Sequence, residues 1–381
     1  MPNLTTPATR TALATKTALA AGTALAALSA LGAGAALAAP SDDLVAAAKK
    51  EGQLTVIALA HSWCNYGGVI ADFKKKYPEI KVNELNPDGS SADEMEAVRA
   101  NKTNKGPQAP DAIDVGLAFG PQAKAEGLTA AYKVSTWDEI PGDIKDPEGH
   151  WYADYYGVMA LGVNTDLVKT APADWADLLK PEYKESVALA GDPRASNQAI
   201  LGVMSAGMGK GGAPGAESGK KGLEFFAALN KAGNFVPVTA KAGTIAQGQT
   251  PIVAAWDYNL LSWRDSLKGN PPVKVLIPSS ASLAGVYVQA ISAYAPHPNA
   301  AKLWMEHIYS DEGQIGLLKG YCHPARFTAM VKANKIPKDL LDKLPPAEAY
   351  DKAVYATVQQ QEANKAVVTA EWDKTVGANV K

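Results

Sequence analysis

Two stretches of the chain place hydroxyl groups and an arginine where predicted helices begin. Ser90 and Ser91 precede one helical pattern, and Arg194, Ser196 and Asn197 precede another. Free backbone N–H groups, hydroxyls and the helix dipole together favour an anion such as phosphate, phosphonate or carboxylate. Arg194 would add a forked cation. The alternative, that these serines only cap their helices, stays open.

A third stretch, Trp256-Asp257-Tyr258, has the composition of an ammonium site. A carboxylate beside aromatic rings holds an amine by an ion pair together with the ring quadrupole. The alternative is that Trp256 is a core residue and Asp257 caps the helix that follows.

Enzyme and metal motifs are missing from the sequence. It contains no G-x-S-x-G elbow, no H-E-x-x-H and no P-loop pattern. The five histidines have no ligand spacing, and two cysteines are too few for a structural zinc site. The sequence therefore predicts no catalytic residues, no metal and no cofactor.

The elements that must position these residues alternate between strands and helices. Apolar runs rich in Val and Ile predict strands at Leu54–Leu59, Ile80–Leu85 and Ile113–Phe119, with helical patterns between them. The segment Ser91-Ala92-Asp93-Glu94 predicts a capping box that opens one of these helices. A second α/β series follows the long apolar run that ends at Asn164. Such alternation indicates parallel βαβ units.

The first 39 residues have the pattern of a secretory signal peptide. Arg10 and Lys16 are the only charges, an Ala/Leu-rich run follows, and Ala36-Leu37-Ala38 offers a cleavage point. No cysteine there could carry a lipid, so we expect an unanchored periplasmic protein. Removing the two positive charges changes the net charge from −2 to −4. A mildly acidic chain without basic blocks does not fit a nucleic acid or a membrane surface as partner.

Seven segments, in order, resemble the solute-binding proteins of bacterial ABC importers. The resemblance is greatest to the two-domain class of extracellular solute-binding family 1, which binds iron, polyamines, phosphonates and sugar phosphates. The matching segments are Gly-Gln-Leu-Thr-Val from Gly52, Asp114-Val115, Gly162-Val163-Asn164-Thr165-Asp166, the run 175–183, the run 191–196, the run 295–302 and Ser310-Asp311-Glu312-Gly313-Gln314.

The resemblance implies an α/β fold of the type II periplasmic-binding-protein kind. Each of two lobes would have its own mostly parallel sheet flanked by helices, and two hinge strands would join them. Residues 40–155 and 285–335 would form lobe 1, residues 156–284 would form lobe 2 with the crossing strands, and residues 336–381 would be C-terminal helices. The ligand would lie at the carboxyl ends of the strands, in the cleft that hinge motion closes.

The resemblance also extends the set of candidate ligand residues. The loop that precedes Gly67-Gly68 adds Asn65 and Tyr66, and the presumed crossing strands add Tyr155, Tyr156 and Tyr287, for which hinge packing is the alternative. The full set of expected ligand residues is Asn65, Tyr66, Ser90, Ser91, Tyr155, Arg194, Ser196, Asn197, Trp256, Asp257, Tyr258 and Tyr287.

Together these observations predict a monomeric binding protein that delivers a small charged solute to an inner-membrane ABC permease. An organic anion, phosphonate or phosphate ester is favoured, with an amine or polyamine as the alternative. Ferric ion is a further alternative, weakened because Asp257-Tyr258-Asn259 stands where iron-binding members usually carry a Tyr-Tyr pair. An exported hydrolase is the rival from another class.

An even pair of cysteines in an oxidising compartment indicates a disulfide, with two reactive thiols as the alternative. Cys64 follows the first predicted strand, and Cys322 follows a helix that the resemblance returns to the first lobe. We therefore expect Cys64 and Cys322 to be joined at one rim of that lobe, without crossing the hinge.

Overall fold

The first helix of the described chain begins and ends at residues that favour helix caps. Helix α1 (Asp42–Glu51) begins after Ser41, whose hydroxyl accepts the Leu44 N–H at 3.3 Å, and ends at Gly52 with φ of 68°. The computed structural model describes residues 40–342 and 353–381, and these belong to one compact unit. The predicted signal peptide, residues 1–39, lies outside the described residues, as do residues 343–352 of the predicted C-terminal helices.

In the described part of the chain, the strands are β1 (Gln53–Ile57), β2 (Lys81–Leu85), β3 (Ala112–Gly116), β4 (Thr129–Ala130), β5 (Tyr152–Asn164), β6 (Val187–Leu189), β7 (Ile252–Trp256), β8 (Val273–Leu276), β9 (Leu283–Ser292), β10 (His323–Pro324) and β11 (Val354–Tyr355). The other helices there are α2 (Tyr66–Lys76), α3 (Ser91–Ala100), α4 (Phe119–Ala125), α5 (Asn197–Gly209), α6 (Ala216–Lys231), α7 (Ala242–Ala246), α8 (Asp257–Leu267), α9 (Pro298–Ile308), α10 (Asp311–Lys319), α11 (Phe327–Lys332), α12 (Lys338–Leu341) and α13 (Val358–Thr375), with 3₁₀ turns at 137–139, 142–144, 175–179 and 181–183.

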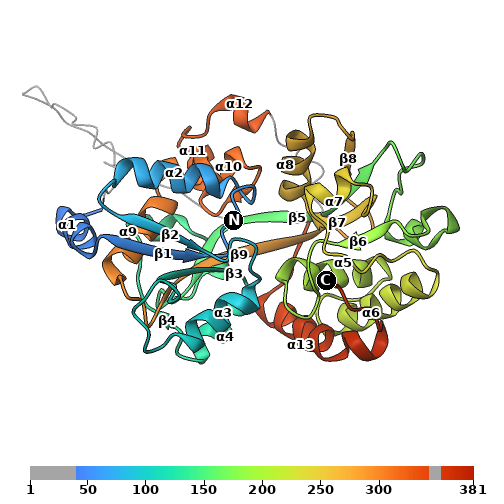
Figure 1. Ribbon diagram of the computed structural model, residues 1–381, viewed down its shortest axis with the longest axis horizontal. Coiled ribbons are helices and arrows are strands. Elements are labelled where there is room, and N and C mark those ends of the chain that lie inside the picture. Colours follow the sequence, from blue (N-terminus) through green and yellow to red (C-terminus); the bar gives the residue numbers. More distant parts are fainter. Residues whose placement is uncertain (1–39, 343–352) are drawn as a thin grey trace, which may run out of the picture. The chain divides into compact units, whose positions relative to one another are not determined.

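Two groups of strands build two lobes (Figure 1). In the first lobe, β1 pairs in parallel with β2 and β3, and β9 lies antiparallel beside β3. In the second lobe, β6 and β7 are parallel, while β5 lies antiparallel to β7 and β8. Helices α1, α2, α9 and α10 pack around the first group, and α5, α6, α8 and α13 around the second.

The long strand β5 belongs to both lobes. Its first part, from Tyr152 to Val158, pairs with β9, and its second part, from Met159 to Asn164, pairs with β7 and β8. The strand order therefore runs from β2 to β6 through β5, whose first part belongs to the sheet of the first lobe and whose second part belongs to the sheet of the second lobe. The sheets are also mixed rather than mostly parallel, because β5 and β9 pass between the lobes without a crossover helix and so enter antiparallel.

Paired glycines on the two long strands let aromatic side chains pack against the backbone. Gly157 and Gly285 are direct partners in the β5–β9 ladder. A Cβ at Gly285 would lie 2.0 Å from the Trp256 ring, and a Cβ at Gly157 would lie 2.4 Å from the Tyr258 ring. The sequence Trp256–Tyr258 is thus anchored in the region where the lobes join.

Glycines also bring two helices of the second lobe close together. The glycine-rich segment 209–219, which the sequence predicts to be a mobile surface loop, joins these helices, and its last residues, from Ala216, belong to α6. A Cβ at Gly207 would lie 1.8 Å from the Ser218 carbonyl oxygen, and one at Gly222 would lie 2.0 Å from that of Val203. These glycines serve the close approach of α5 and α6.

No helix among residues 40–342 and 353–381 is long and apolar enough to cross a membrane.

Candidate functional site

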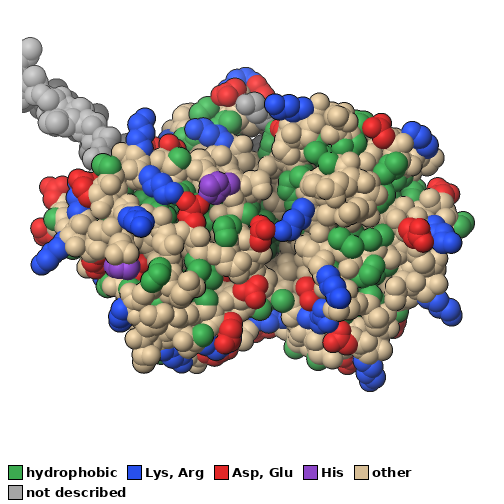
Figure 2. Space-filling view, viewed as in Figure 1, with side chains coloured by type: hydrophobic (Ala, Val, Ile, Leu, Met, Phe, Trp, Pro, Cys, Tyr) green, Lys and Arg blue, Asp and Glu red, His purple; other side chains and the backbone are tan. Residues whose placement is uncertain are grey.

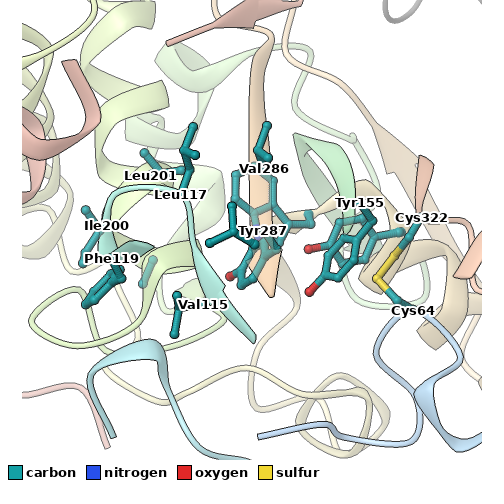
Figure 3. Close-up of a cluster of buried hydrophobic side chains, with 14 of the residues drawn as sticks. Cys64, Val115, Leu117, Phe119, Tyr155, Ile200, Leu201, Val286, Tyr287 and Cys322 are labelled. Carbon is teal, nitrogen blue, oxygen red and sulfur yellow. A yellow bond between two sulfur atoms is a disulfide. The ribbon is translucent and has the colours of Figure 1, made fainter. Parts of the chain in front are cut away.

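The loop after β1 is held in a strained conformation by a disulfide. Ala58, Cys64 and Asn65 have positive φ angles of 61°, 47° and 56°. Cys64 is bonded to Cys322, and their Cα atoms are 5.3 Å apart, which confirms the predicted pairing (Figure 3). The bond fixes the position of the neighbouring Trp63, whose indole N–H donates to the Tyr155 hydroxyl at 2.7 Å.

Asp114 lies at the centre of a buried hydrogen-bond network beside this loop. Its Oδ2 accepts hydrogen bonds from the hydroxyls of Tyr66 and Tyr155, each at 2.9 Å. Its Oδ1 has no hydrogen-bond partner among the described residues. The Tyr155 ring stacks on the Tyr287 ring with centroids 5.3 Å apart, and Figure 3 shows the two rings side by side near the disulfide. One oxygen of Asp114 is therefore in contact with two tyrosine hydroxyls, and the other is buried without a partner among the described residues.

The capping box of α3 lies one residue earlier than the sequence predicts. Ser90 is the N-cap, and its reciprocal partner is Asp93. Ser91 and Glu94 instead face β3: the Ser91 hydroxyl accepts the Gly116 N–H at 3.1 Å, and the Glu94 carboxylate accepts the Asp114 N–H at 2.7 Å. The predicted pair thus ties the start of α3 to the strand that carries Asp114.

The start of α5 approaches the same strand from the second lobe. The Ser196 side chain makes no capping hydrogen bond, and the first-turn residues Asn197, Gln198 and Ala199 carry no charge. A Cβ at Gly116 would lie 2.0 Å from the Asn197 side chain, so the two lobes touch here only because residue 116 is glycine.

A cavity of about 570 Å³ lies between the lobes, at the carboxyl ends of β1, β2 and β3. From the first lobe its charged and aromatic lining consists of Trp63, Asp88, Asp93, Asp114 and Tyr287. From the second lobe the lining includes Asp192, Ser196, Asn197, Lys241 and Trp263. Five of the predicted ligand residues therefore line it, namely Ser90, Ser91, Ser196, Asn197 and Tyr287.

The carboxylates of this lining differ in what already neutralises them. Asp88 forms a 2.8 Å ion pair with Lys241 across the mouth of the cavity. Asp192 is paired with Arg194 at 2.7 Å, and Asp93 is engaged by the start of α3. Among the described lining residues, Lys241 is the one cationic side chain, and Asp114 has no cationic partner.

Arg194, predicted to bind an anion, does not line the cavity. Its guanidinium contacts Asp192, Asp373 of α13 and the Asn379 side-chain oxygen. The same is true of the Trp256–Tyr258 stretch, because all three residues are at most 1% exposed. The Asp257 carboxylate accepts the Val158 N–H at 2.9 Å, which places it in the region where the lobes join.

The remaining predicted ligand residues lie behind the cavity wall. Tyr66 and Tyr155 are fully buried and reach the cavity only through Asp114. The Asn65 side chain donates to the Gly316 carbonyl at 3.0 Å, so it ties the loop to α10. The sequence did not predict which element each of these side chains would face.

Burial sets the electrostatics of this wall. It raises the pKa of Asp114 well above its usual value, and the nearby Asp154 charge adds to the shift. Burial also raises the pKa of Asp154 to about 7 and that of Glu94 well above its normal range. The pKa values of Tyr66 and Tyr155 are raised by burial and by the Asp114 carboxylate. These phenols are therefore hydrogen-bond donors, and phenolate is disfavoured.

No group of three or more His, Cys, Asp or Glu side chains in the described ranges is arranged to hold a metal ion. The site residues that the sequence analysis did not single out are chiefly Trp63, Asp114, Lys241 and Trp263. Asp114 carries a usable signal, since it is an acid inside an otherwise apolar strand pattern. The other three lie in loops or on a helix face without a distinctive pattern.

The amino-acid sequence of this chain is similar to those of bacterial solute-binding proteins. A model of the family described as bacterial extracellular solute-binding protein matches residues 110–352, which is more than half of the chain. The spermidine/putrescine-binding periplasmic protein of Escherichia coli (strain K12) is 26% identical over 243 residues, and the match covers 61% of each protein. The chain thus spans about three fifths of the length of that relative.

Solved structures share the fold. The periplasmic binding protein AfuA from Actinobacillus pleuropneumoniae, with fructose-6-phosphate bound, has a TM-score of 0.66 and 21% identity, covering 86% of this chain and 99% of the other. Iron-bound HitA from Pseudomonas aeruginosa has a TM-score of 0.62 and 15% identity, covering 84% and 98%. The expected type II periplasmic-binding-protein fold is confirmed, and so is the expected relation to bacterial solute-binding proteins. The chain belongs to the family of bacterial extracellular solute-binding proteins.

Proposed function

We propose that this protein is the exported solute-binding component of an ABC importer and that its solute carries an ammonium group. The observation that carries the proposal is Asp114, a residue of the cavity lining whose buried Oδ1 has no hydrogen-bond partner among the described residues. Because a buried carboxylate without a cationic partner is costly, a cationic ligand would stabilise it.

Aromatic rings around Asp114 support an amine in particular. Trp63 and Tyr287 line the cavity with ring centroids 5.3 Å apart, and Trp263 lines it from the second lobe. An ammonium group gains about 0.5–2 kcal/mol over such rings, and more when it is desolvated. The relative from Escherichia coli is named for spermidine and putrescine, which are amines of this kind.

This proposal departs from the anion that the sequence favoured. That expectation depended on Arg194, whose guanidinium is engaged outside the cavity, and on two helix starts. The start of α3 carries Asp93 and Glu94 in its first turn, so its favourable field for an anion is offset. The start of α5 has no such acid.

A second candidate is a solute with an anionic group in addition to its amine. The uncharged first turn of α5 and the Asn197 side-chain amide, which line the cavity, favour such a ligand. Ferric ion has less support, because the Tyr66 and Tyr155 hydroxyls donate to Asp114 and do not line the cavity.

We also propose how the rest of the protein serves this capture. The signal peptide directs the chain to the periplasm, and the monomeric protein delivers its solute to an inner-membrane ABC permease. The two lobes, with boundaries near residues 155 and 285, close on the solute by bending of β5 and β9. The contact between Asn197 and Gly116 supports a closed arrangement. Cell fractionation and N-terminal sequencing should find a periplasmic protein that begins near residue 40.

The ligand test compares amines with anions. Protein refolded from denaturant, and so freed of retained solute, is titrated in a calorimeter with putrescine, spermidine, choline and fructose 6-phosphate. We expect an amine to bind, and we expect Asp114→Asn to weaken that binding by about 1.5–3 kcal/mol, which is the range for a hydrogen bond to a charged group. Asp88→Asn is the matched control, because Asp88 lines the same cavity but is exposed and paired with Lys241. Binding of fructose 6-phosphate with no response to any amine would refute the proposal.

A further inference from the structure

Tyr66 has one hydroxyl hydrogen and two carboxylates to satisfy. Its oxygen is 2.9 Å from Asp114 Oδ2 and 2.9 Å from Asp154 Oδ2. The Gln289 amide already donates to the same oxygen at 3.0 Å. A phenol hydroxyl donates one hydrogen bond and accepts up to two. Only one carboxylate can therefore receive the Tyr66 hydrogen. The contact between Tyr66 and the other carboxylate has no hydrogen between its two oxygens.

A single additional proton resolves this shortage. If Asp114 or Asp154 is protonated, its O–H can donate to the remaining lone pair of Tyr66, and every contact in the chain of hydrogen bonds is then satisfied. Asp154 is fully buried, Glu94 is 1% exposed, and Asp114 is 6% exposed. Two ionised carboxylates sharing a buried site repel each other, so the proton is favoured by charge as well as by geometry.

The groups that face Asp114 supply no positive charge. They are Tyr66 from α2, Glu94 from α3, Asp154 and Tyr155 from β5, Tyr258 from α8, Tyr287 from β9 and Tyr309 after α9. Each of them is a carboxylic acid or a phenol. Of the three carboxylates, only Asp114 lines the cavity.

We infer that Asp114 and Asp154 share a proton in the empty protein, and that the cationic solute binds in exchange for it. This inference rests on the proposed function, since it requires a ligand with an ammonium group. The proton leaves the pair formed by Asp114 and Asp154 for water in the cavity, and the ammonium group takes its place beside the Asp114 carboxylate. The charge of the site is the same before and after.

The exchange makes Asp154 and Glu94 positioning residues that act through Asp114. Neither lines the cavity, yet their charges determine whether Asp114 is ionised when the solute arrives. Burial raises the pKa of Asp154 to about 7 and raises that of Asp114 well above normal. Near and below neutral pH the solute must displace the proton, so its affinity increases as the pH rises, by at most about tenfold per pH unit for one proton. At a pH above the raised pKa values the dependence disappears.

Calorimetry with putrescine tests the exchange directly. Its amines resemble that of lysine, with a pKa of about 10.4, and stay charged below pH 8.5. Titration at pH 6.5 in two buffers of different ionisation enthalpy measures the protons released on binding. We expect a release approaching one proton for the wild-type protein and an affinity that rises between pH 5.5 and 8. Asp154→Asn should abolish most of the release and flatten the pH profile, while binding persists at pH 8. Glu94→Gln is a second variant, with the same expected direction, in case Asp154→Asn does not fold.

The stability of the free protein provides a readout that needs no ligand. The raised pKa values predict that stability is fully present below the unfolded-state pKa, about 4, and falls as the pH rises through the folded-state values. Asp154→Asn should reduce this fall. Putrescine binding without proton release would overturn the exchange and leave the proposed function intact. If none of the tested amines binds while the stability of the free protein still depends on pH, the proposed function is wrong and the proton exchange is wrong as well.

Discussion

The two walls of the cavity are built differently, although both present a helix start. The first-lobe wall is fixed by the Cys64–Cys322 disulfide and by the hydrogen bonds that converge on Asp114. The second-lobe wall consists of the start of α5, without a side-chain cap, and the exposed Lys241. A preorganised wall holds a charge in one place, whereas the other wall can approach it and complete the site. If the protein binds its solute as we propose, this difference predicts that recognition depends mainly on the first lobe and closure on the second.

The face of the molecule shown in Figure 2 has no concentration of charge. Lys and Arg side chains are interspersed there with Asp and Glu side chains, and no patch of one sign stands out.

The largest effect on stability should come from removing the disulfide that fixes the first-lobe wall. The disulfide closes a loop of 258 residues. Replacing both cysteines by serine should lower the free energy of unfolding by on the order of 5 kcal/mol, by loop-closure entropy. Denaturant titration measures this loss, and reduction of the wild-type protein is the control. Putrescine affinity should also fall, because Trp63 is no longer fixed beside Cys64. An unchanged midpoint would mean that packing alone holds the loop.

The contact between the walls is tested by Gly116→Ala. The new methyl group would overlap the Asn197 side chain, so the closed arrangement should lose about 1–3 kcal/mol, the usual penalty for overpacking. Ligand affinity should fall accordingly. Small-angle scattering of the liganded protein should show lobes further apart than in the wild type. Gly142→Ala is the control, since a Cβ there has no atom within 4 Å and Gly142 does not line the cavity. Equal affinities for the two variants would contradict the contact.

The second wall is tested by an acid placed at the start of α5. Ser196→Asp should cap the helix and increase stability by roughly 0.5–2 kcal/mol. The same charge should weaken the binding of a solute that carries a carboxylate or phosphonate, by about 0.3–1 kcal/mol, because it offsets the field at the helix start. Binding of a diamine should not weaken. Parallel titrations with putrescine and 2-aminoethylphosphonate measure the contrast, and a loss for the diamine alone would reverse our assignment of the two walls.

The smallest effect is expected for the ion pair between Lys241 and Asp88 at the mouth of the cavity. Lys241 and Asp88 are 55% and 70% exposed, so their ion pair should contribute less than about 1 kcal/mol and should be screened by salt. Lys241→Met should therefore change affinity by less than about fivefold, mainly through faster dissociation. Stopped-flow kinetics at low and high salt would reveal the difference. An effect larger than that of Gly116→Ala would show that the ion pair at the mouth of the cavity, rather than the contact between Gly116 and Asn197, controls closure.

Much of the local structure followed from the sequence. Ser41 and Gly52 mark the ends of α1, and apolar runs mark β1, β2 and β3, because capping and burial patterns depend on neighbouring residues. The capping box at α3 was displaced by one residue for a tertiary reason. Glu94 is drawn to the Asp114 N–H in the adjacent strand, and Asp93 takes its place at Ser90.

The candidate site was less predictable. The sequence pointed to Asp257 as the acid for an amine, since it lies between aromatic residues, yet its carboxylate binds the Val158 N–H where the lobes join. Asp114 attracted attention only as part of a family pattern. The sequence neighbours of the two acids therefore pointed to Asp257, whereas the fold places Asp114 in the cavity lining.

The sequence by itself determined the family, the α/β elements, the pair of cysteines and the serines at two helix starts, since all of these depend on short segments or on their order. Only the tertiary structure decided which carboxylate faces the cavity and that Arg194 is engaged elsewhere. The partners of Asp114 lie 41 and 48 residues away in sequence, and those of Arg194 up to 185. Contacts at such separations depend on the register of strands and the packing of helices, which local patterns do not encode.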